Sequence, residues 1–261
     1  MKKAILIVSN GTSDIAALEA SIMKFEHRVR NEFKEYEVFR AFFSEKIISK
    51  LKSKYSTKVN TPLEALIEIE ELGYEELVIQ PLYIVCGVEY KILKDVVDEF
   101  KKESKLRKII VGNPALIEND KARTFDFINS IKDNFKVNKV TVVAVHGTKT
   151  SANKCYLELN DAFRSCGLSK VFVGAVEGEP SFDWVLTSLH NNNIKEVLLM
   201  PFLIVAGFHA KKDLVSTSPR SWKSILEREE IHVEEKLIGL GEMTGFQEFF
   251  LRDLRKLIDD I

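Results

Sequence analysis

The sequence predicts a two-part α/β fold with parallel sheets, built from two copies of one four-strand unit. Short runs rich in β-branched residues alternate along the chain with longer segments that carry apolar residues at three- and four-residue intervals. Strands that alternate with helices predict parallel sheets with right-handed crossovers. The order of these segments, and several of their residues, then recurs in the second half of the chain.

Four segments in each half are expected to be strands, and their consecutive apolar residues fit strands that are covered on both faces. They are residues 4–8, 38–42, 77–84 and 108–111 in the first half, and 140–145, 170–176, 197–204 and 233–238 in the second. Helices are expected between them, and the helical period is clearest in residues 14–33, 62–72 and 89–102.

The two halves match best at the first strand and at the strand that contains a proline. Residues 5–12 (ILIVSNGT) align with 141–148 (TVVAVHGT), and residues 76–89 align with 196–209, where Glu, Pro, Ile, Val and Gly recur at the same offsets. A looser match pairs residues 111–113 with 238–240. Chance similarity between generic strands is disfavoured, because the matched proline and glycine are not generic strand residues.

The copies are expected to join near residues 135–139, which gives an N-terminal half of 1–136 and a C-terminal half of 137–261. The last helix has the option of packing back on the first half. Proline is disfavoured inside a strand, so Pro81 and Pro201 are expected at bends or bulges.

Composition excludes several classes of protein. Hydrophobic residues make up 45% and charged residues 30% of the 261 residues, as in proteins with a packed core. Lys and Arg (38) balance Asp and Glu (39), which argues against a nucleic-acid binder. No apolar run approaches the roughly 18 residues that span a bilayer, and the three cysteines form no CxxC pair. We expect a cytoplasmic protein with no nucleic-acid or membrane partner.

Candidate site residues follow the strands, because ligands of open parallel sheets bind beyond the carboxyl ends of the strands. Asn10 and His146 follow the first strand of each copy, and Glu89 and His209 follow the two proline-containing strands. Imidazole and carboxylate groups suit Co, Ni, Fe or Zn, and three protein ligands leave positions open for exchange. The sequence therefore predicts a catalytic divalent-metal site of His146, His209 and Glu89, where a neutral histidine can also accept a proton.

The polar loop at residues 9–13 (SNGTS) allows one alternative. A short loop between a strand and a helix can hold a phosphate on its backbone N–H groups, as in nucleotide-binding proteins. The loop is neither a P-loop nor GxGxxG, and its second copy has His146 where a phosphate loop needs a small residue. Basic residues that either form a solvated surface or meet an anionic substrate are Lys149, Lys211, Lys212 and Arg220.

Several motifs together resemble one known family. They are Ser-x-Gly-Thr-Ser at 9–13, Gly-x-Glu-Tyr at 87–90, His-Gly at 146–147, Gly-Ala-Val-Glu at 174–177 and Met-Pro-x-x-x-Val-Ala-Gly-x-His-Ala at 200–210. The sequence is similar there to the anaerobic sirohydrochlorin cobaltochelatases, which are class II chelatases alongside ferrochelatase. Further matches at 221–223 and 239–242 extend the resemblance over nearly the whole chain.

The resemblance implies two flavodoxin-like or Rossmann-like domains with the active-site cleft between them. It implies ATP-independent insertion of Co²⁺ into sirohydrochlorin in anaerobic cobalamin synthesis, with His146 and His209 as metal ligands, Glu89 assisting, and no cofactor beyond the substrate metal. The residues expected to contact sirohydrochlorin or a related tetrapyrrole are Asn10, Gly11, Thr12, Gly147, Glu177 and Phe208.

The sequence departs from the family pattern at three positions that line or border the expected cleft. Asn10 replaces a usual aromatic residue, Phe208 a common Asp, and Lys212 a common Asn, while residues 216–220 are not acidic. These changes bear on the macrocycle and the metal. Iron or nickel insertion into a related tetrapyrrole therefore stays an alternative, as does a non-catalytic carrier of tetrapyrrole or metal.

Overall fold

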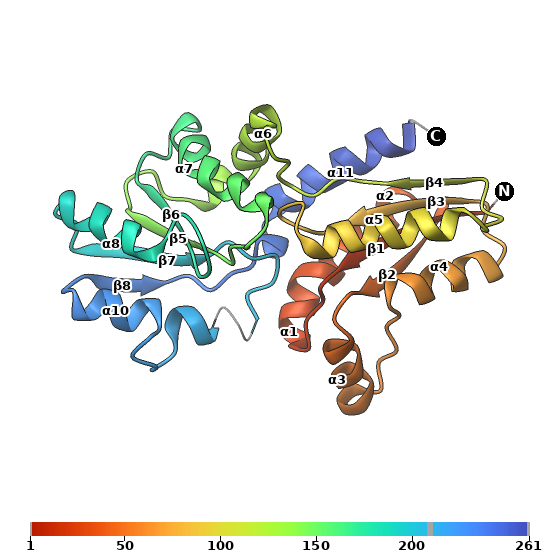
Figure 1. Ribbon diagram of the computed structural model, residues 1–261, viewed down its shortest axis with the longest axis horizontal. Helices are drawn as coiled ribbons and strands as arrows, with labels where there is room; N and C mark the ends of the chain where they lie inside the picture. The colour runs from red at the N-terminus through yellow and green to blue at the C-terminus, as the bar shows by residue number, and fades with distance from the viewer. Residues whose placement is uncertain (1, 208–210, 260–261) are drawn as a thin grey trace. The chain divides into compact units, whose positions relative to one another are not determined.

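The computed structural model describes residues 2–207 and 211–259, which form two compact α/β units (Figure 1). Unit 1 consists of Met1–Ala115 and Glu248–Ile261, and unit 2 of Leu116–Gln247. Each unit has a four-stranded sheet whose neighbouring strands are all parallel. The predicted two-part α/β architecture with parallel sheets is confirmed.

The two sheets have the same strand order. In unit 1 the order is β2-β1-β3-β4, with β1 (Lys3–Ser9), β2 (Tyr36–Phe42), β3 (Glu76–Pro81) and β4 (Lys108–Val111). In unit 2 the order is β6-β5-β7-β8, with β5 (Thr141–Val145), β6 (Val171–Ala175), β7 (Glu196–Pro201) and β8 (His232–Glu235). The copies seen in the sequence are therefore copies in topology as well.

The register of the central strands agrees with the alignment of the two halves. Ile5 lies opposite Val78 in unit 1, and Thr141 lies opposite Leu198 in unit 2. These are the pairs that the alignment makes equivalent. The duplication thus extends to the pairing of individual residues.

The looser match at the fourth strand is wrong by three residues. Val111 pairs with Ile79, and Glu235 pairs with the equivalent Leu199, so Val111 corresponds to Glu235. The misleading signal was a glycine after an apolar residue in both copies. Gly239 instead passes close to another loop, where a Cβ would lie 2.5 Å from the carbonyl oxygen of Ile204.

Both proline-containing strands end at the proline, earlier than the predicted ends at residues 84 and 204. Proline has no N–H to donate to a neighbouring strand. The N–H groups of Leu82 and Phe202, one residue later, donate to the ends of β1 and β5 at 2.7 Å. Pro81 and Pro201 therefore mark equivalent points where the chain leaves each sheet.

Helices connect the strands, and the predicted helical segments of the first half are confirmed by α1 to α2, α4 and α5. Unit 1 contains α1 (Ile15–Leu18), the π-helical η1 (Glu19–Met23), α2 (Lys24–Glu32), α3 (Glu45–Tyr55), α4 (Pro62–Glu71) and α5 (Val88–Lys101). Unit 2 contains α6 (Lys121–Ile131), η2 (Lys132–Asn134), η3 (Ser151–Asn153), α7 (Lys154–Ser165), α8 (Phe182–Asn191), η4 (Lys211–Val215), α10 (Trp222–Arg228) and η5 (Leu240–Glu242). Among the helices in the described ranges, none is long and apolar enough to cross a membrane.

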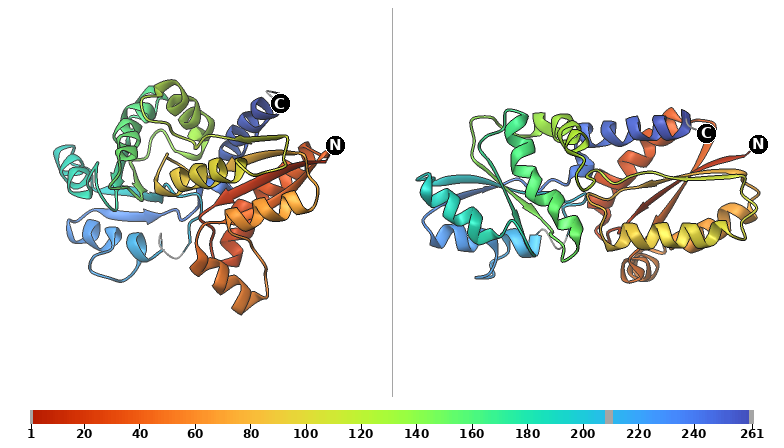
Figure 2. Two further views of the ribbon diagram at one scale, coloured as in Figure 1. Left: turned by 45° about the vertical axis from the view of Figure 1, so that its right-hand side comes forward. Right: turned by 45° about the horizontal axis from the view of Figure 1, so that its top comes forward.

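The sheet of unit 1 is buried on both faces. Ala4, Leu6 and Val8 of β1 belong to one core cluster with residues of α4 and α5. Because side chains alternate along a strand, Ile5 and Ile7 point to the opposite face, where both are at most 1% exposed. The right-hand view of Figure 2 shows α5 on one side of this sheet and α2 and α11 (Thr244–Asp259) on the other.

The sheet of unit 2 is also packed on both faces. One cluster joins Val142 and Leu199 of the sheet with Leu189 of α8 and Leu226 of α10. A second group consists of phenylalanines in edge-to-face contact, with ring centroids 5.0–6.2 Å apart. Its members are Phe127, Phe135, Phe163, Phe202 and Phe246.

The last helix of each sequence copy lies mainly in the unit of the other copy. Helix α6 follows β4 but belongs to unit 2, where Phe127 contacts Phe202. Helix α11 follows β8, begins in unit 2 and continues in unit 1, where Phe250 contacts Phe25. The compact units therefore divide the chain at other places than the sequence copies do, and halves of 1–136 and 137–261 stay a prediction about the copies.

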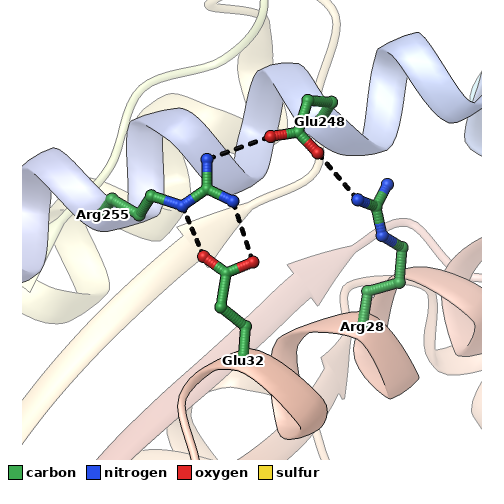
Figure 3. A network of polar contacts seen from close by, with 4 residues as sticks. All are labelled: Arg28, Glu32, Glu248 and Arg255. Carbon is green, nitrogen blue, oxygen red and sulfur yellow. Dashed lines mark hydrogen bonds and ion pairs between the residues drawn. The ribbon is translucent and has the colours of Figure 1, made fainter.

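A network of four charged side chains joins α11 to α2 within unit 1 (Figure 3). Arg255 donates to Glu32 at 2.9 Å and to Glu248 at 3.0 Å, and Arg28 donates to Glu248 at 2.7 Å. The guanidinium of Arg255 lies between the two carboxylates, so each charge has an opposite neighbour.

Candidate functional site

The loops after β1 and β5 share one internal hydrogen bond. The hydroxyl of Thr12 accepts from the N–H of Asp14 at 3.1 Å, and that of Thr148 accepts from the N–H of Thr150 at 3.2 Å. Such bonds from a hydroxyl to the backbone two residues on stabilise a turn. The two loops are therefore built alike, at the carboxyl end of each first strand.

A glycine in each loop takes a left-handed conformation, with φ of +79° at Gly11 and +81° at Gly147. Glycine adopts this conformation without a steric penalty. A Cβ at Gly147 would lie 1.7 Å from the carbonyl oxygen of Glu177, and a Cβ at Gly11 would lie 2.4 Å from the ring of Phe42. Close packing adds a second reason why only glycine fits.

Three residues of the first loop were predicted to contact the substrate. The side chain of Asn10 is exposed, whereas Thr12 is only 8% exposed and its hydroxyl already serves the turn. The N–H of Gly11 donates to the Ser9 hydroxyl at 3.2 Å. Asn10 is thus the residue of this loop that presents its side chain at the surface, and substrate contact by all three stays a prediction.

His146 follows β5 directly and is exposed. Its Nδ1 lies 3.2 Å from the carbonyl oxygen of Gly147. A carbonyl oxygen only accepts, so this hydrogen bond requires the proton on Nδ1, and in the neutral imidazole the lone pair is then on Nε2. A histidine held in this way offers Nε2 as a metal ligand or proton acceptor.

The structure brings three predicted site residues of unit 2 together: His146, Gly147 and Glu177. The N–H of Glu177 donates to the carbonyl oxygen of His146 at 3.0 Å, and the N–H of Val176 donates to that of Val145 at 3.0 Å. Glu177 itself is exposed. An imidazole and a carboxylate thus come from neighbouring chain segments at the carboxyl edge of one sheet.

A shallow hollow, with room for about 10 Å³, lies beside His146. Its lining residues are Ala144, Val145, His146, Val176, Leu203, Asp213 and Leu214. Sequence reasoning missed Asp213, a half-buried residue of η4. A carboxylate and an imidazole on one hollow can attract a cation or exchange a proton.

Glu89 lies in unit 1, at the second residue of α5, and is half-buried. Gly87 precedes the helix and caps it without a side chain. A Cβ at Gly87 would lie 3.6 Å from Oε2 of Glu89, so the carboxylate lies close to the residue that caps the helix. A negative charge is favourable at the N-terminus of a helix.

The structure describes two of the three predicted metal ligands, His146 and Glu89. His209 and Phe208 lie outside the described residues. Within residues 2–207 and 211–259, no three His, Cys, Asp or Glu side chains form a group that could hold a metal ion. The joint binding of one ion by His146, His209 and Glu89 therefore stays a prediction.

Comparison with known families finds a match over nearly the whole chain. The family described as "Cobalt chelatase (CbiK)" matches residues 3–259. The match covers both units and each of the predicted site residues.

Two relatives that match the chain over nearly its full length have names of one kind. The sirohydrochlorin cobaltochelatase of Salmonella typhimurium is 31% identical over 261 residues, which cover 99% of this chain and 97% of that protein. The sirohydrochlorin cobaltochelatase CbiKC of Nitratidesulfovibrio vulgaris is 30% identical over 255 residues, which cover 97% of this chain and 89% of that protein.

Solved structures share the fold at low sequence identity. The sirohydrochlorin chelatase SirB of Bacillus subtilis subspecies spizizenii, in complex with cobalt, superposes with a TM-score of 0.64 at 14% identity, covering 100% of this chain and 97% of that one. The siroheme-synthesis enzyme CbiX of denitrifying bacteria gives a TM-score of 0.52 at 14% identity, covering 97% of this chain and 99% of that one.

Proposed function

The chain belongs to the cobalt chelatase family, and on this premise we propose that it inserts Co²⁺ into sirohydrochlorin in anaerobic cobalamin synthesis, without ATP. The observation that carries the proposal is the family match over residues 3–259. The geometry at His146 supports it, because an exposed imidazole with Nε2 available can bind a divalent ion and release it again.

Insertion has two chemical requirements. Two pyrrole N–H protons must leave the ring, and the ion must exchange its oxygen and imidazole ligands for four ring nitrogens. In this proposal His146 and His209 bind the ion, and one of them or Glu89 accepts a proton. A planar ring presents its nitrogens poorly, so a site that favours a bent ring stabilises the transition state.

The proposed substrate is an anion that carries several carboxylates. Lys149, Lys211, Lys212 and Arg220 are exposed in unit 2, and we propose that these side chains pair with substrate carboxylates. Cobalt is a substrate here, and the proposal includes no further cofactor. The proposed location is the cytoplasm.

The test is the visible spectrum of sirohydrochlorin mixed with Co²⁺ under anaerobic conditions, with no ATP present. The mixture is compared with and without catalytic amounts of the protein. We expect faster conversion to the cobalt complex over many turnovers. A rate equal to that of the protein-free control would contradict the proposal.

The same assay separates the alternatives. Conversion that stops after one turnover, with product retained on the protein, would indicate a carrier. Faster conversion with Fe²⁺ or Ni²⁺ than with Co²⁺ would change the proposed metal and leave the reaction class. Metal choice in such sites depends on geometry and supply, because many divalent ions bind the same ligands.

A further inference from the structure

The side chain of Asn153 joins two loops of unit 2 that carry predicted site residues. Its Oδ1 accepts a hydrogen bond from the N–H of Thr148 at 3.2 Å, and its Nδ2 donates to the carbonyl oxygen of Glu179 at 2.6 Å. Thr148 lies in the loop after β5, two residues after His146. Glu179 lies in the loop after β6, two residues after Glu177. One carboxamide therefore holds these two loops together.

The place of Asn153 in the chain makes this use of its side chain unusual. The residue ends η3 and directly precedes α7, and at such a position an asparagine commonly accepts a hydrogen bond from the first turn of the helix. Within the described residues, Asn153 makes no capping bond of this kind. An N–H only donates and a carbonyl oxygen only accepts, so the two loops determine the orientation of the amide. The side chain thus serves the loops and not its own helix.

Glu177 lies between two hydrogen bonds that hold the loop after β6, residues 176–180. Its own N–H donates to the carbonyl oxygen of His146 at 3.0 Å. Two residues later, the carbonyl oxygen of Glu179 accepts from Asn153. A backbone that is held on both sides of a residue restricts where the exposed side chain of that residue can point. The carboxylate of Glu177 is therefore presented from a loop that is fixed against the segment carrying His146.

The first copy of the unit cannot form this connection. Continuing the alignment of the loops after β1 and β5 places Ala17 opposite Asn153. The alignment still holds there, because α1 begins at Ile15 and η3 begins at the equivalent Ser151. Alanine has no polar side-chain atom that could join two loops. The connection thus occurs in the copy whose first loop carries the imidazole of His146.

We propose that Asn153 is a positioning residue for metal insertion, and that its carboxamide sets the spacing of His146 and Glu177 by fixing their two loops. The inference rests on the proposed function. A metal ligand and a group that contacts the macrocycle must keep their relative places while the ion passes between them. A displacement of about 1 Å can lower a rate about a hundredfold. Asn153 acts through these two residues, so its loss should change where they lie and not which groups are present.

The first test measures amide hydrogen exchange by NMR and needs no turnover. Asn160→Ala is the matched control for Asn153→Ala, because Asn160 also lies in α7 and its Oδ1 accepts from the N–H of Val173, within β6, at 2.9 Å. The N–H of Glu177 keeps its own acceptor in both variants. We expect its exchange to become about fivefold faster in Asn153→Ala, as for the loss of one hydrogen bond, and to stay within about twofold in Asn160→Ala. Thermal unfolding checks both folds.

The second test is a double-mutant cycle with Glu177→Ala, measured as kcat/KM for sirohydrochlorin. Asn153→Ala alone should lower kcat/KM about tenfold. When it is added to Glu177→Ala, the further loss should be less than about threefold, because the carboxylate that it positions is gone. A merely structural role would give the same loss in both backgrounds. Asn160→Ala should keep kcat/KM within about twofold of the wild type.

Asn153→Asp separates the two hydrogen bonds and replaces Asn153→Ala if the alanine variant does not fold. Aspartate can still accept from the N–H of Thr148, but it has no N–H for the carbonyl oxygen of Glu179. Exchange at Thr148 should therefore stay as slow as in the wild type. Exchange at Glu177 should become faster, as in the alanine variant.

The outcomes separate this inference from the function on which it rests. No turnover by the wild-type protein would overturn the proposed function, whereas faster exchange at Glu177 in Asn153→Ala would still show that the carboxamide holds the loops. Wild-type turnover with unchanged exchange at Glu177, or with unchanged kcat/KM in Asn153→Ala, would overturn the inference alone. So would an equal fall of kcat/KM in Asn160→Ala, or an undiminished loss in the Glu177→Ala background.

Discussion

The two units have the same strand order and differ in the side chains that directly follow their strands. The loops after β1 and β5 have equivalent turns and equivalent left-handed glycines. At the exposed position before each glycine, however, one copy has Asn10 and the other His146. The comparison teaches that the loop geometry constrains the glycine and the threonine in both copies, whereas the exposed position is free to acquire chemistry in one of them.

The largest expected effect is the loss of the imidazole. His146→Ala should lower the insertion rate about a thousandfold, because it removes a metal ligand, and even second-sphere partners of such ligands are worth about 10–100-fold. The stability should change little, since the side chain is exposed. The measurement is the anaerobic insertion assay, together with thermal unfolding.

Asn10→Ala is the matched control for this variant, because it truncates the equivalent side chain in the other copy. It should lower the rate by less than about tenfold, as for the loss of a single hydrogen bond to the substrate. Equal losses in the two variants would break the comparison and indicate that both loops contribute alike. A His146→Ala variant with near-normal turnover would exclude this histidine from the metal site.

The second effect concerns the glycines that follow these residues. Gly147→Ala should cost about 3 kcal/mol of unfolding free energy, since the left-handed conformation costs about 1–2 kcal/mol and the added Cβ would collide with backbone. That backbone is the carbonyl of Glu177, 1.7 Å away, whereas the obstacle at Gly11 is the buried ring of Phe42, 2.4 Å away. Because this contact is longer and involves a side chain, Gly11→Ala should cost less, about 2 kcal/mol.

Urea denaturation of the two alanine variants measures this difference. Because the collision at Gly147 also displaces the segment beside His146, the insertion rate should fall more in Gly147→Ala than in Gly11→Ala. Equal free energies of unfolding would show that the loop containing Glu177 moves away from the added Cβ without loss of stability. The close approach of the two chain segments would then have no part in holding the site together.

Much of the fold was predictable because the repeat carries its own register. The alignment of residues 5–12 with 141–148 placed Val145 at the end of β5 and His146 directly after it, as the structure shows. The extent of β3 and β7 was wrong, because apolar residues continue past Pro81 and Pro201 although the strands end at these prolines. Hydrophobicity reports burial, and burial continues in the loop.

Other features depend on contacts that a sequence pattern does not encode. The amphipathic period of α6 and α11 is the same whichever sheet the helix covers, so their exchange between the copies follows only from contacts such as Phe127 with Phe202. Asp213 becomes a candidate because it shares a hollow with His146.

The exchanged helices offer a second comparison and a smaller effect. Helix α11 is held in unit 1 partly by the charge network of Arg255, whereas α6 buries Phe127 completely in unit 2. Arg255→Met should cost about 1 kcal/mol at low salt and less at 1 M, because its side chain is 41% exposed and salt screens such pairs. Phe127→Leu should cost about 1–2 kcal/mol at any salt concentration, since it removes apolar contact.

Urea denaturation at 0.05 M and 1 M NaCl tests this pair of variants. Methionine keeps an apolar stem in place of the arginine, so the difference reports the charges. A salt-independent cost of Arg255→Met would contradict an electrostatic role for the network. A salt-dependent cost of Phe127→Leu would show that the comparison between the helices fails.

The smallest effect is the acid dependence of the same network. The hydrogen bond from Arg255 lowers the pKa of Glu248 below its ordinary value, and burial opposes this only in part. A carboxyl whose folded-state pKa is lowered stabilises the fold fully above its unfolded value of about 4.3, and this contribution disappears as the pH falls through the folded pKa. The stability difference between the wild type and Arg255→Met should therefore be constant from about pH 7 to pH 5 and shrink below about pH 4. Phe127→Leu supplies the control, because its cost involves no titrating group and should persist at acid pH. If the Arg255→Met difference instead stayed constant down to pH 3.5, the charged contact between α11 and α2 would not contribute to stability through Glu248.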